Sequence, residues 1–377
     1  MKIAIMTQPL GKNYGGMMQA FALQKVLKNM GHEVVTIDRQ PAGHGIVHNS
    51  LRLIYRSIQK IKGKRKAPVN IERHYPLIFN NPHGFIKNNI KISESFFSTE
   101  KLKSHFSNNS YDAVVVGSDQ TWRPRYSPDI YNFYLDFLSC NNVKRVAYAS
   151  SFGVDSWEYS AEETKRCAEL AKQFDAISVR ETSGIELCDK YLGVKSEFVL
   201  DPTLLLEKED YLELIGDRYR NDAGEGVFTY WLDRSDEKRV AAEQLANQLN
   251  TYSYQCQAKN SINSLNSSNL KNYKMPPVED WLASFAKASV VLTDSFHGMV
   301  FSIIFQKPFV VVVNKERGAS RFISLLNKLG LEERLVDKPE SISYDLLMKP
   351  LDGDVLKILK DYQVNSKNFL DHYLVDC

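Results

Sequence analysis

Short apolar runs alternate with helical patterns along almost the whole chain. An apolar run at 3–6 is followed by a helical pattern over 17–29, which ends at Gly31, and then by a second apolar run at 34–37. A strand, a crossover helix and a parallel strand produce this order, so the segment predicts a βαβ unit.

The same alternation continues in two series. Buried-strand patterns occur at 113–116, 145–149, 176–179 and 197–200, then at 227–231, 289–293 and 309–313, with helical patterns at 161–173 and 236–250. We therefore predict an α/β fold with two Rossmann-like domains, at residues 1–205 and 206–350, that face a cleft. A chain of 377 residues is long enough for both, at about 150 residues per domain.

Three segments depart from this alternation. Apolar positions on one helix face predict an amphipathic helix over 354–373, so we expect the segment 351–377 to pack back on the first domain. Residues 41–97 and 257–277 lack a regular pattern and are predicted to be long loops or lids.

The overall charge of the chain is nearly balanced, because 48 Lys and Arg residues oppose 45 Asp and Glu. A net charge of +3 does not indicate a dedicated nucleic-acid-binding protein. No apolar run approaches the ~18 residues that cross a bilayer. The short apolar N-terminus is more typical of a strand than of a signal peptide, so we expect a cytoplasmic protein whose scattered cysteines are reduced.

Positive charge is concentrated in one place, the basic stretch 52–73. It contains eight Lys or Arg residues and a single acid, Glu72. Two interpretations stay open: a solvated helix or loop face, or a patch that attracts an anionic acceptor or a lipid surface. The second interpretation would place the protein peripherally at the inner face of the membrane.

Common catalytic motifs are absent from the sequence. No phosphate-binding loop or dinucleotide fingerprint follows a predicted strand, and there is no nucleophile elbow and no zinc-protease helix. Because no His, Cys or carboxylate cluster has metal-ligand spacing, neither a metal nor a cofactor is predicted.

The most informative junction follows the strand predicted at 289–293. Asp294 and Ser295 are favourable N-cap residues, and they lead into a helix with His297 and Gly298 in its first turn. Open α/β sheets bind ligands at such carboxyl ends, close to the positive end of a helix dipole. His297 is therefore a candidate acid/base, and a purely structural histidine is the alternative.

Two further junctions place polar groups at the same kind of edge. The loop after the first strand is glycine-rich and contains Asn13, Tyr14, Gly15 and Gly16. It is either a plain turn or a close backbone approach to a ligand. The loop after the strand at 113–116 sets polar groups beside an aromatic ring, in Ser118, Asp119, Gln120 and Trp122. That combination suits the binding of a sugar.

Arginine side chains near two strand ends are candidates for binding an anion. Arg180 is expected either to bind a carboxylate or phosphate of a ligand, or to form an ion pair with Glu181 or another neighbour. Arg317 and Arg321 follow the strand at 309–313 and offer a second source of positive charge.

Taken in order, these junctions resemble the motifs of the polysaccharide pyruvyl transferase family. The resembling segments are N-Y-G-G with Q-A-F-A-L (13–16 and 19–23), V-G-S-D-Q-T-W (116–122), Y-A-S-S-F-G (148–153), S-V-R-E (178–181), D-P-T (201–203), and the histidine-glycine turn with K-P (307–308). They cover nearly the whole chain. No single motif identifies the family, but the motifs in this order are specific for it.

The resemblance implies a two-domain arrangement similar to the glycosyltransferase-B fold. It also implies transfer of pyruvate from the co-substrate phosphoenolpyruvate onto two hydroxyls of a sugar or lipid-linked glycan, as a cyclic ketal in a surface polysaccharide or its precursor. His297 would be the acid/base, with Arg180 and Arg321 as donor clamps. The helix N-terminus at Ser295 and Gly298 would be an additional anion site.

One position departs from the family pattern. Better-studied members resemble R-x-H at the histidine turn, whereas this chain has Ser295 two residues before His297. Either Arg317 or Arg321 supplies the missing charge, or the donor is not phosphoenolpyruvate. The alternatives to ketal transfer are a nucleotide-sugar-dependent glycosyltransferase and a non-catalytic glycan-binding protein.

Overall fold

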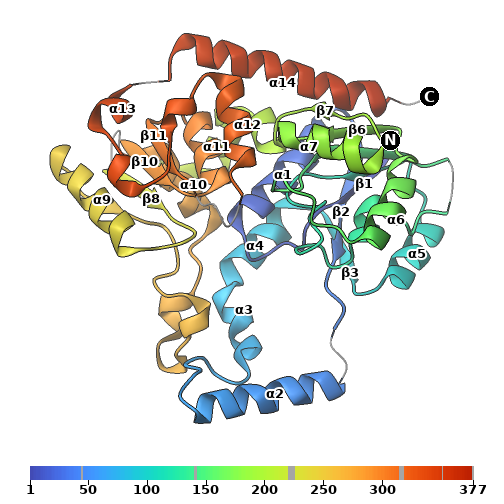
Figure 1. Cartoon of the computed structure of the whole chain (residues 1–377), viewed down its shortest axis with the longest axis horizontal. Coiled ribbons are helices and arrows are strands. Elements are labelled where there is room, and N and C mark those ends of the chain that lie inside the picture. Colours follow the sequence, from blue (N-terminus) through green and yellow to red (C-terminus); the bar gives the residue numbers. More distant parts are fainter. Residues whose placement is uncertain (44–45, 140–141, 220–225, 314–317, 350, 376–377) are drawn as a thin grey trace.

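Two parallel sheets with helices packed around them form the body of the molecule, and one long helix runs along both (Figure 1). The structure is a computed structural model that describes residues 1–43, 46–139, 142–219, 226–313, 318–349 and 351–375. Within these residues no helix is long and apolar enough to cross a membrane. Cys167, Cys188 and Cys256 are free thiols.

The first sheet has seven strands in the order β3-β2-β1-β4-β5-β6-β7. They are β1 (Lys2–Met6), β2 (Glu33–Arg39), β3 (Ile92–Phe96), β4 (Ala113–Val116), β5 (Lys144–Ser150), β6 (Ala176–Val179) and β7 (Glu197–Phe198). Every pairing is parallel. From β1 the chain adds strands first on one side of the sheet and then, starting with β4, on the other. Such a switch point between β1 and β4 creates a ligand-binding crevice at their carboxyl ends.

The second sheet has five strands in the order β12-β11-β10-β8-β9, again all parallel. They are β8 (Val227–Tyr230), β9 (Ser253–Tyr254), β10 (Val290–Thr293), β11 (Phe309–Val312) and β12 (Leu335–Val336). The corresponding switch point lies between β8 and β10. The predicted α/β fold with two Rossmann-like units is therefore confirmed.

Fourteen α-helices of the described residues connect and cover these strands. Those up to the last strand of the first sheet are α1 (Tyr14–Asn29), α2 (Ile46–Ile61), α3 (Tyr75–Ile78), α4 (Asn80–Asn89), α5 (Thr99–Asn108), α6 (Ala161–Ala171) and α7 (Thr182–Leu187). The others are α8 (Lys208–Ile215), α9 (Asp236–Gln248), α10 (Val278–Lys287), α11 (Phe296–Ile304), α12 (Ser320–Leu329), α13 (Tyr344–Met348) and α14 (Gly353–Tyr373).

Helix α1 lies between the two sheets and is buried over most of its length. Its N-terminus is capped by Asn13, whose Oδ1 accepts a hydrogen bond of 3.0 Å from the Gly15 N–H. Its apolar residues join one continuous core that also contains side chains of α10 and α11. Tyr14 stacks on Trp281 of α10 at 5.0 Å, so the two sheets share a core.

The C-terminal helix α14 packs on residues of the first sheet's half of the chain. The Leu200 N–H donates to the Ser366 hydroxyl at 2.9 Å, and the Gln363 amide donates to the Leu204 carbonyl at 2.7 Å. Phe369 also contacts the ring of Tyr148. These contacts hold the short segment that follows β7.

The prediction that residues 41–97 form a long loop is wrong, because they contain α2, α3, α4 and β3. Residues 257–277 consist of irregular chain and short 3-10 turns, as a loop prediction implies. The two segments pack on each other in a small separate core, formed by Ala67, Ile71, Ile78, Phe79, Leu265 and Tyr273. Apart from α4 and β3, which lie with the main body, these segments form an arm below the two sheets, with α2 at its tip (Figure 1).

Candidate active site

The carboxyl ends of both sheets contribute residues to one cavity of about 520 Å³. The first sheet supplies the loops after β1 and β4, and the second supplies the junction between β10 and α11. Seven of the predicted site residues line this cavity, namely Asn13, Gly16, Asp119, Gln120, Ser295, His297 and Arg321. Arg317 lies outside the described residues.

His297 is buried at the boundary between the two halves. Its Nε2 lies 3.8 Å from Asp201 Oδ2 and makes no hydrogen bond with the residues that the structure describes. Burial lowers its pKa from 6.5 to about 4; Asp201 opposes this shift, and Arg180 adds to it. The imidazole is therefore neutral at pH 7, and its Nε2 is a buried nitrogen to which no described residue is hydrogen-bonded.

Gly15 makes room for this imidazole. A Cβ at position 15 would lie 2.0 Å from His297 Nδ1, a distance at which one of the two groups must move. The sequence predicted a close backbone approach to a ligand or a plain turn, and the structure shows an approach to a protein side chain from the other half of the molecule. Gly16 is the glycine that lines the cavity.

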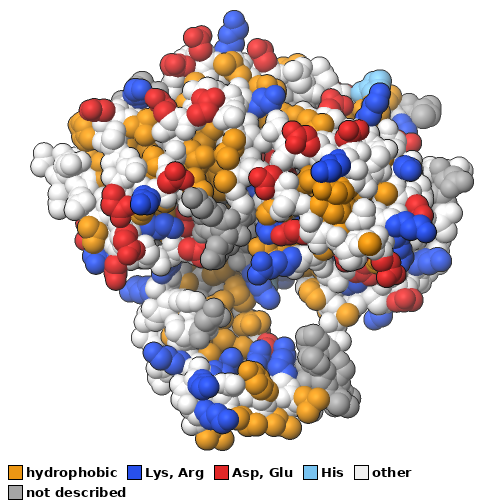
Figure 2. Space-filling model, viewed as in Figure 1, with side chains coloured by type: hydrophobic (Ala, Val, Ile, Leu, Met, Phe, Trp, Pro, Cys, Tyr) orange, Lys and Arg blue, Asp and Glu red, His pale blue; other side chains and the backbone are white. Residues whose placement is uncertain are grey.

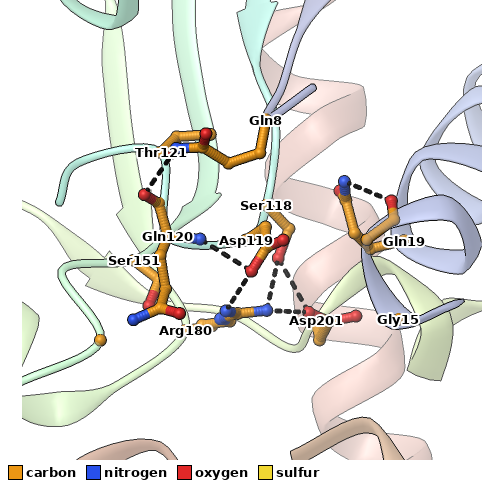
Figure 3. Close-up of polar contacts among 12 residues, drawn as sticks. Gln8, Gly15, Gln19, Ser118, Asp119, Gln120, Thr121, Ser151, Arg180 and Asp201 are labelled. Atoms are coloured by element: carbon orange, nitrogen blue, oxygen red, sulfur yellow. Dashed lines mark hydrogen bonds and ion pairs between the residues drawn. The ribbon is translucent and has the colours of Figure 1, made fainter. Parts of the chain in front are cut away.

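Arg180 is held by carboxylates of the protein itself (Figure 3). Its Nη1 donates to Asp201 Oδ2 at 2.6 Å and to the Ser118 hydroxyl at 3.2 Å, and its Nη2 donates to Asp119 Oδ1 at 3.3 Å. Burial alone raises the pKa of Asp201, but attraction to the His297 and Arg180 side chains lowers it to about 2. Of the two interpretations of Arg180, the ion pair with protein carboxylates describes these contacts.

Arg321, by contrast, lines the cavity while being almost fully buried. Burial and the nearby Arg180 lower its pKa to about 10, so it still carries a positive charge at pH 7. Its guanidinium carbon lies 5.6 Å from the centre of the Phe296 ring, next to His297 in sequence. The cavity thus combines a neutral imidazole with a buried cation.

Asp119 has a backbone conformation that is unusual for its residue type. Its φ is +75°, and its Oδ1 accepts a hydrogen bond from the Gln120 N–H at 2.9 Å. Such left-handed conformations persist where surrounding contacts fix them, and they cluster at functional sites. The turn directs one carboxylate oxygen at Arg180 and places the residue in the cavity wall.

Besides Gly15 and Arg180, four predicted residues that the structure describes do not line the cavity. Trp122 is fully buried in the first half, where it stacks on Tyr134, and its indole N–H donates to the Phe133 carbonyl. The Tyr14 hydroxyl donates to the Pro276 carbonyl, and Ser118 supports Asp201. A strand-end position fixes where a residue lies but not the direction of its side chain, so sequence alone could not separate these residues from cavity-lining ones.

Gly298 is the fourth of these predicted residues that do not line the cavity. A Cβ there would lie 2.2 Å from Thr293 Oγ1, and its N–H donates to the Ser295 hydroxyl at 3.4 Å. Ser295 therefore serves as the N-cap of α11, and Gly298 lets that helix pack on β10. The Gly298 N–H is used within the protein.

Sequence reasoning missed two kinds of site residue. Asp201 belonged to a recognised motif, but it had no assigned role; its Oδ1 accepts hydrogen bonds from Thr203, which leaves Oδ2 for Arg180. Lys12 lines the cavity at its exposed rim and directly precedes the Asn13 cap. Lys12 could have been identified from the sequence because it lies beside a glycine-rich loop at the end of a strand.

No metal-binding group of three or more His, Cys, Asp or Glu side chains occurs among the described residues. The side chains that line the cavity have chemistry of their own. They can exchange a proton through His297 and hold an anion through Arg321 and Lys12.

Two Rossmann-like sheets that present their carboxyl ends to one cavity define the class of glycosyltransferase-B-like proteins. A family model described as polysaccharide pyruvyl transferase matches residues 13–316. The chain belongs to the polysaccharide pyruvyl transferase family, in agreement with its motifs. A comparison with curated proteins gave no match.

Solved structures share the fold at low identity. A glycosyltransferase from Rickettsia africae ESF-5 is 10% identical with a TM-score of 0.53, over 100% of this chain and 99% of that one. S. aureus MnaA, solved with UDP, is 12% identical with a TM-score of 0.51, over 99% and 96% of the two chains. UDP-GlcNAc 2-epimerase from Methanocaldococcus jannaschii is 12% identical with a TM-score of 0.51, over 96% and 92%. This likeness concerns the fold alone.

Proposed function

We propose that the protein transfers pyruvate from phosphoenolpyruvate onto two hydroxyls of a sugar in a surface polysaccharide or its precursor, forming a cyclic ketal. The observation that carries the proposal is the neutral His297 imidazole in the same cavity as the Arg321 guanidinium. Family membership gives the reaction class. The donor and acceptor are the parts that we propose.

His297 is the acid/base in this proposal. Once the bound donor has raised its pKa, the protonated ring gives its proton to C3 of the enolpyruvyl group; this carbon becomes a methyl group and leaves C2 electrophilic. The oxygen of the first sugar hydroxyl then bonds to C2, and its proton returns to His297. Phosphate then leaves with the C2–O bond pair, and the second hydroxyl closes the ring and gives up its proton to the phosphate. In net terms, the two hydroxyl protons thus end on C3 and on phosphate.

The depressed pKa of His297 suits this sequence of proton transfers. A neutral imidazole can accept a proton at once, and negative charge from a bound donor raises its pKa, because an opposite charge favours the protonated form. The protonated ring can then deliver the proton to carbon. In a site removed from water, hydrogen bonds to the charge that develops on the donor in the transition state accelerate the reaction further.

Arg321 takes the role of donor clamp, with Lys12 at the rim as a second cation. Arg180 is reassigned from donor clamp to positioning residue, since its guanidinium fixes Asp201 and Asp119. Arg321 thereby supplies the charge that the family's arginine would place at position 295.

The test is phosphate release from phosphoenolpyruvate in the presence of candidate glycans, with ketal formation followed by mass spectrometry. His297→Gln is expected to lower turnover by about 10²- to 10⁴-fold. His372→Gln, a change of the exposed histidine on α14, is the matched control. Turnover retained in the first variant, or saturable binding of a nucleotide sugar in preference to phosphoenolpyruvate, would overturn the proposal.

A further inference from the structure

Helix α2 carries an uncovered apolar stripe. Leu51, Ile54, Tyr55, Ile58 and Ile61 recur at the spacing of one helix face, and their exposed fractions run from 44% to 86%. Single exposed apolar side chains are ordinary on protein surfaces, but five along one helix form a continuous patch. The stripe lies at the tip of the arm, away from both sheets (Figure 1).

The opposite face of α2 is fixed to the arm. Arg56 Nη1 donates to both carboxylate oxygens of Glu72 at 2.9 and 3.0 Å and to the Val69 carbonyl at 3.2 Å. Arg52 lies 3.4 Å from the same carboxylate. The one acid of the basic stretch therefore holds the helix with its apolar stripe directed outward.

Uncompensated positive charge lies at the C-terminal end of the helix that carries the stripe. Lys60, Lys62, Lys64 and Lys66 are exposed, and within the described residues none of them has an acidic partner. Figure 2 shows hydrophobic and Lys or Arg side chains side by side at the tip of the arm. An apolar helix face bordered by lysines is the pattern of helices that lie in the plane of a membrane interface.

We propose that α2 docks the protein on a lipid bilayer that contains anionic headgroups. The stripe would enter the boundary between headgroups and acyl chains, and the four lysines would contact headgroup phosphates. A second copy of the chain fits less well, because pairing two such faces brings their lysine clusters together. The proposal holds whether or not ketal transfer is the reaction.

The experiment is co-sedimentation of the full chain with vesicles of phosphatidylcholine alone or mixed with phosphatidylglycerol. Binding is expected only to the mixed vesicles. Ile54→Glu with Ile58→Glu is expected to lower the partition coefficient more than tenfold, because it places charge in the apolar stripe. Lys62→Gln and Lys64→Gln are expected to lower it roughly fivefold each.

The controls change the same residue types on α14. Val364→Glu, at an exposed apolar position, and Lys357→Gln, at an exposed lysine, are expected to leave vesicle binding unchanged. Thermal unfolding checks that every variant folds. We expect that they do, because all the substituted positions are exposed. Equal binding to both vesicle types, or binding unaffected by the α2 changes, would overturn the proposal. The proposal would also be overturned if the protein bound no vesicles and formed a dimer in sedimentation equilibrium that Ile54→Glu with Ile58→Glu dissociates.

Discussion

At the level of single side chains, the site is defined by what surrounds His297. Gly15 lies against one side of the ring, and Asp201 lies 3.8 Å from Nε2. Histidine is the side chain whose charge responds most readily to such surroundings near neutral pH. Small changes beside this ring should therefore have large effects on activity.

Gly15→Ala is the sharpest of these changes. Its methyl group would meet the imidazole at 2.0 Å, so we expect His297 to move and turnover to fall towards that of His297→Gln. Gly84→Ala in the middle of α4 is the control, since a Cβ there meets nothing within 4 Å. That control should be neutral or stabilise by up to about 1 kcal/mol. Steady-state kinetics and thermal unfolding measure both, and an active Gly15→Ala protein would contradict the assignment.

The pKa of His297 predicts how stability depends on pH. The folded value is about 4 and the unfolded value about 6.5, so the folded state binds fewer protons between them. The free energy of unfolding should rise by up to about 3 kcal/mol as the pH increases from about 4 to about 6.5, and this gain is lost as the pH falls. Urea unfolding across this range should show the slope in the wild type.

His297→Gln should lack that part of the slope. His105, whose pKa burial also lowers, is present in both proteins, so the difference isolates His297. Equal slopes in the two proteins would contradict the buried, neutral state. The Asp201 carboxylate acts in a separate window, because its pKa lies at about 2.

The identity of these residues was only partly predictable. His297 could be found because a strand, two N-cap residues and a histidine-glycine pair follow one another in the chain. Its contact with Gly15 could not, because the two residues are brought together by the packing of α1 against α11. Arg180 was identified as a charged residue at a strand end, but only the fold shows that Asp201 is its partner.

At the level of helices and strands, local pattern was a good guide to the sheets. The strands predicted at 113–116 and 176–179 have the same bounds as β4 and β6, since fully buried parallel strands are continuous apolar runs. Among the helices of 41–97, α3 packs Ile78 on the segment 257–277, whereas α4 packs Phe85 and Ile86 on the core that contains α1. The apolar residues of α2 recur at helical spacing, so this helix could have been predicted from its amphipathic pattern.

Helix α14 should contribute to stability through a buried hydrogen bond. Gln363→Ala leaves the Leu204 carbonyl without its 2.7 Å donor, and we expect a loss of about 1 to 3 kcal/mol. Lys360→Ala, also on α14, removes an exposed ion pair with Glu207 at the start of α8 and should change stability by less than about 0.5 kcal/mol. Urea denaturation distinguishes them, and equal effects would show that α14 is held by its apolar residues alone.

At the level of the whole molecule, the two sheets are connected in several places within the described residues. They share the core around α1, α14 crosses from one to the other, and the arm joins a segment from each. The sequence predicted two α/β units and a returning helix. It did not predict the arm, because contacts between segments almost 200 residues apart, such as Asn81 with Met275, leave no local pattern.

The contact of Gly15 with His297 has one more consequence. Burial depresses the proton affinity of the imidazole, and the opposite half of the chain contributes Gly15 against the ring and Arg180, one of the two arginines that lower its pKa further. Were the halves to part, water would reach the ring and its affinity for protons would return to that of a free histidine. The titration of this one ring, followed by NMR, would then report whether the two halves of the molecule are in contact.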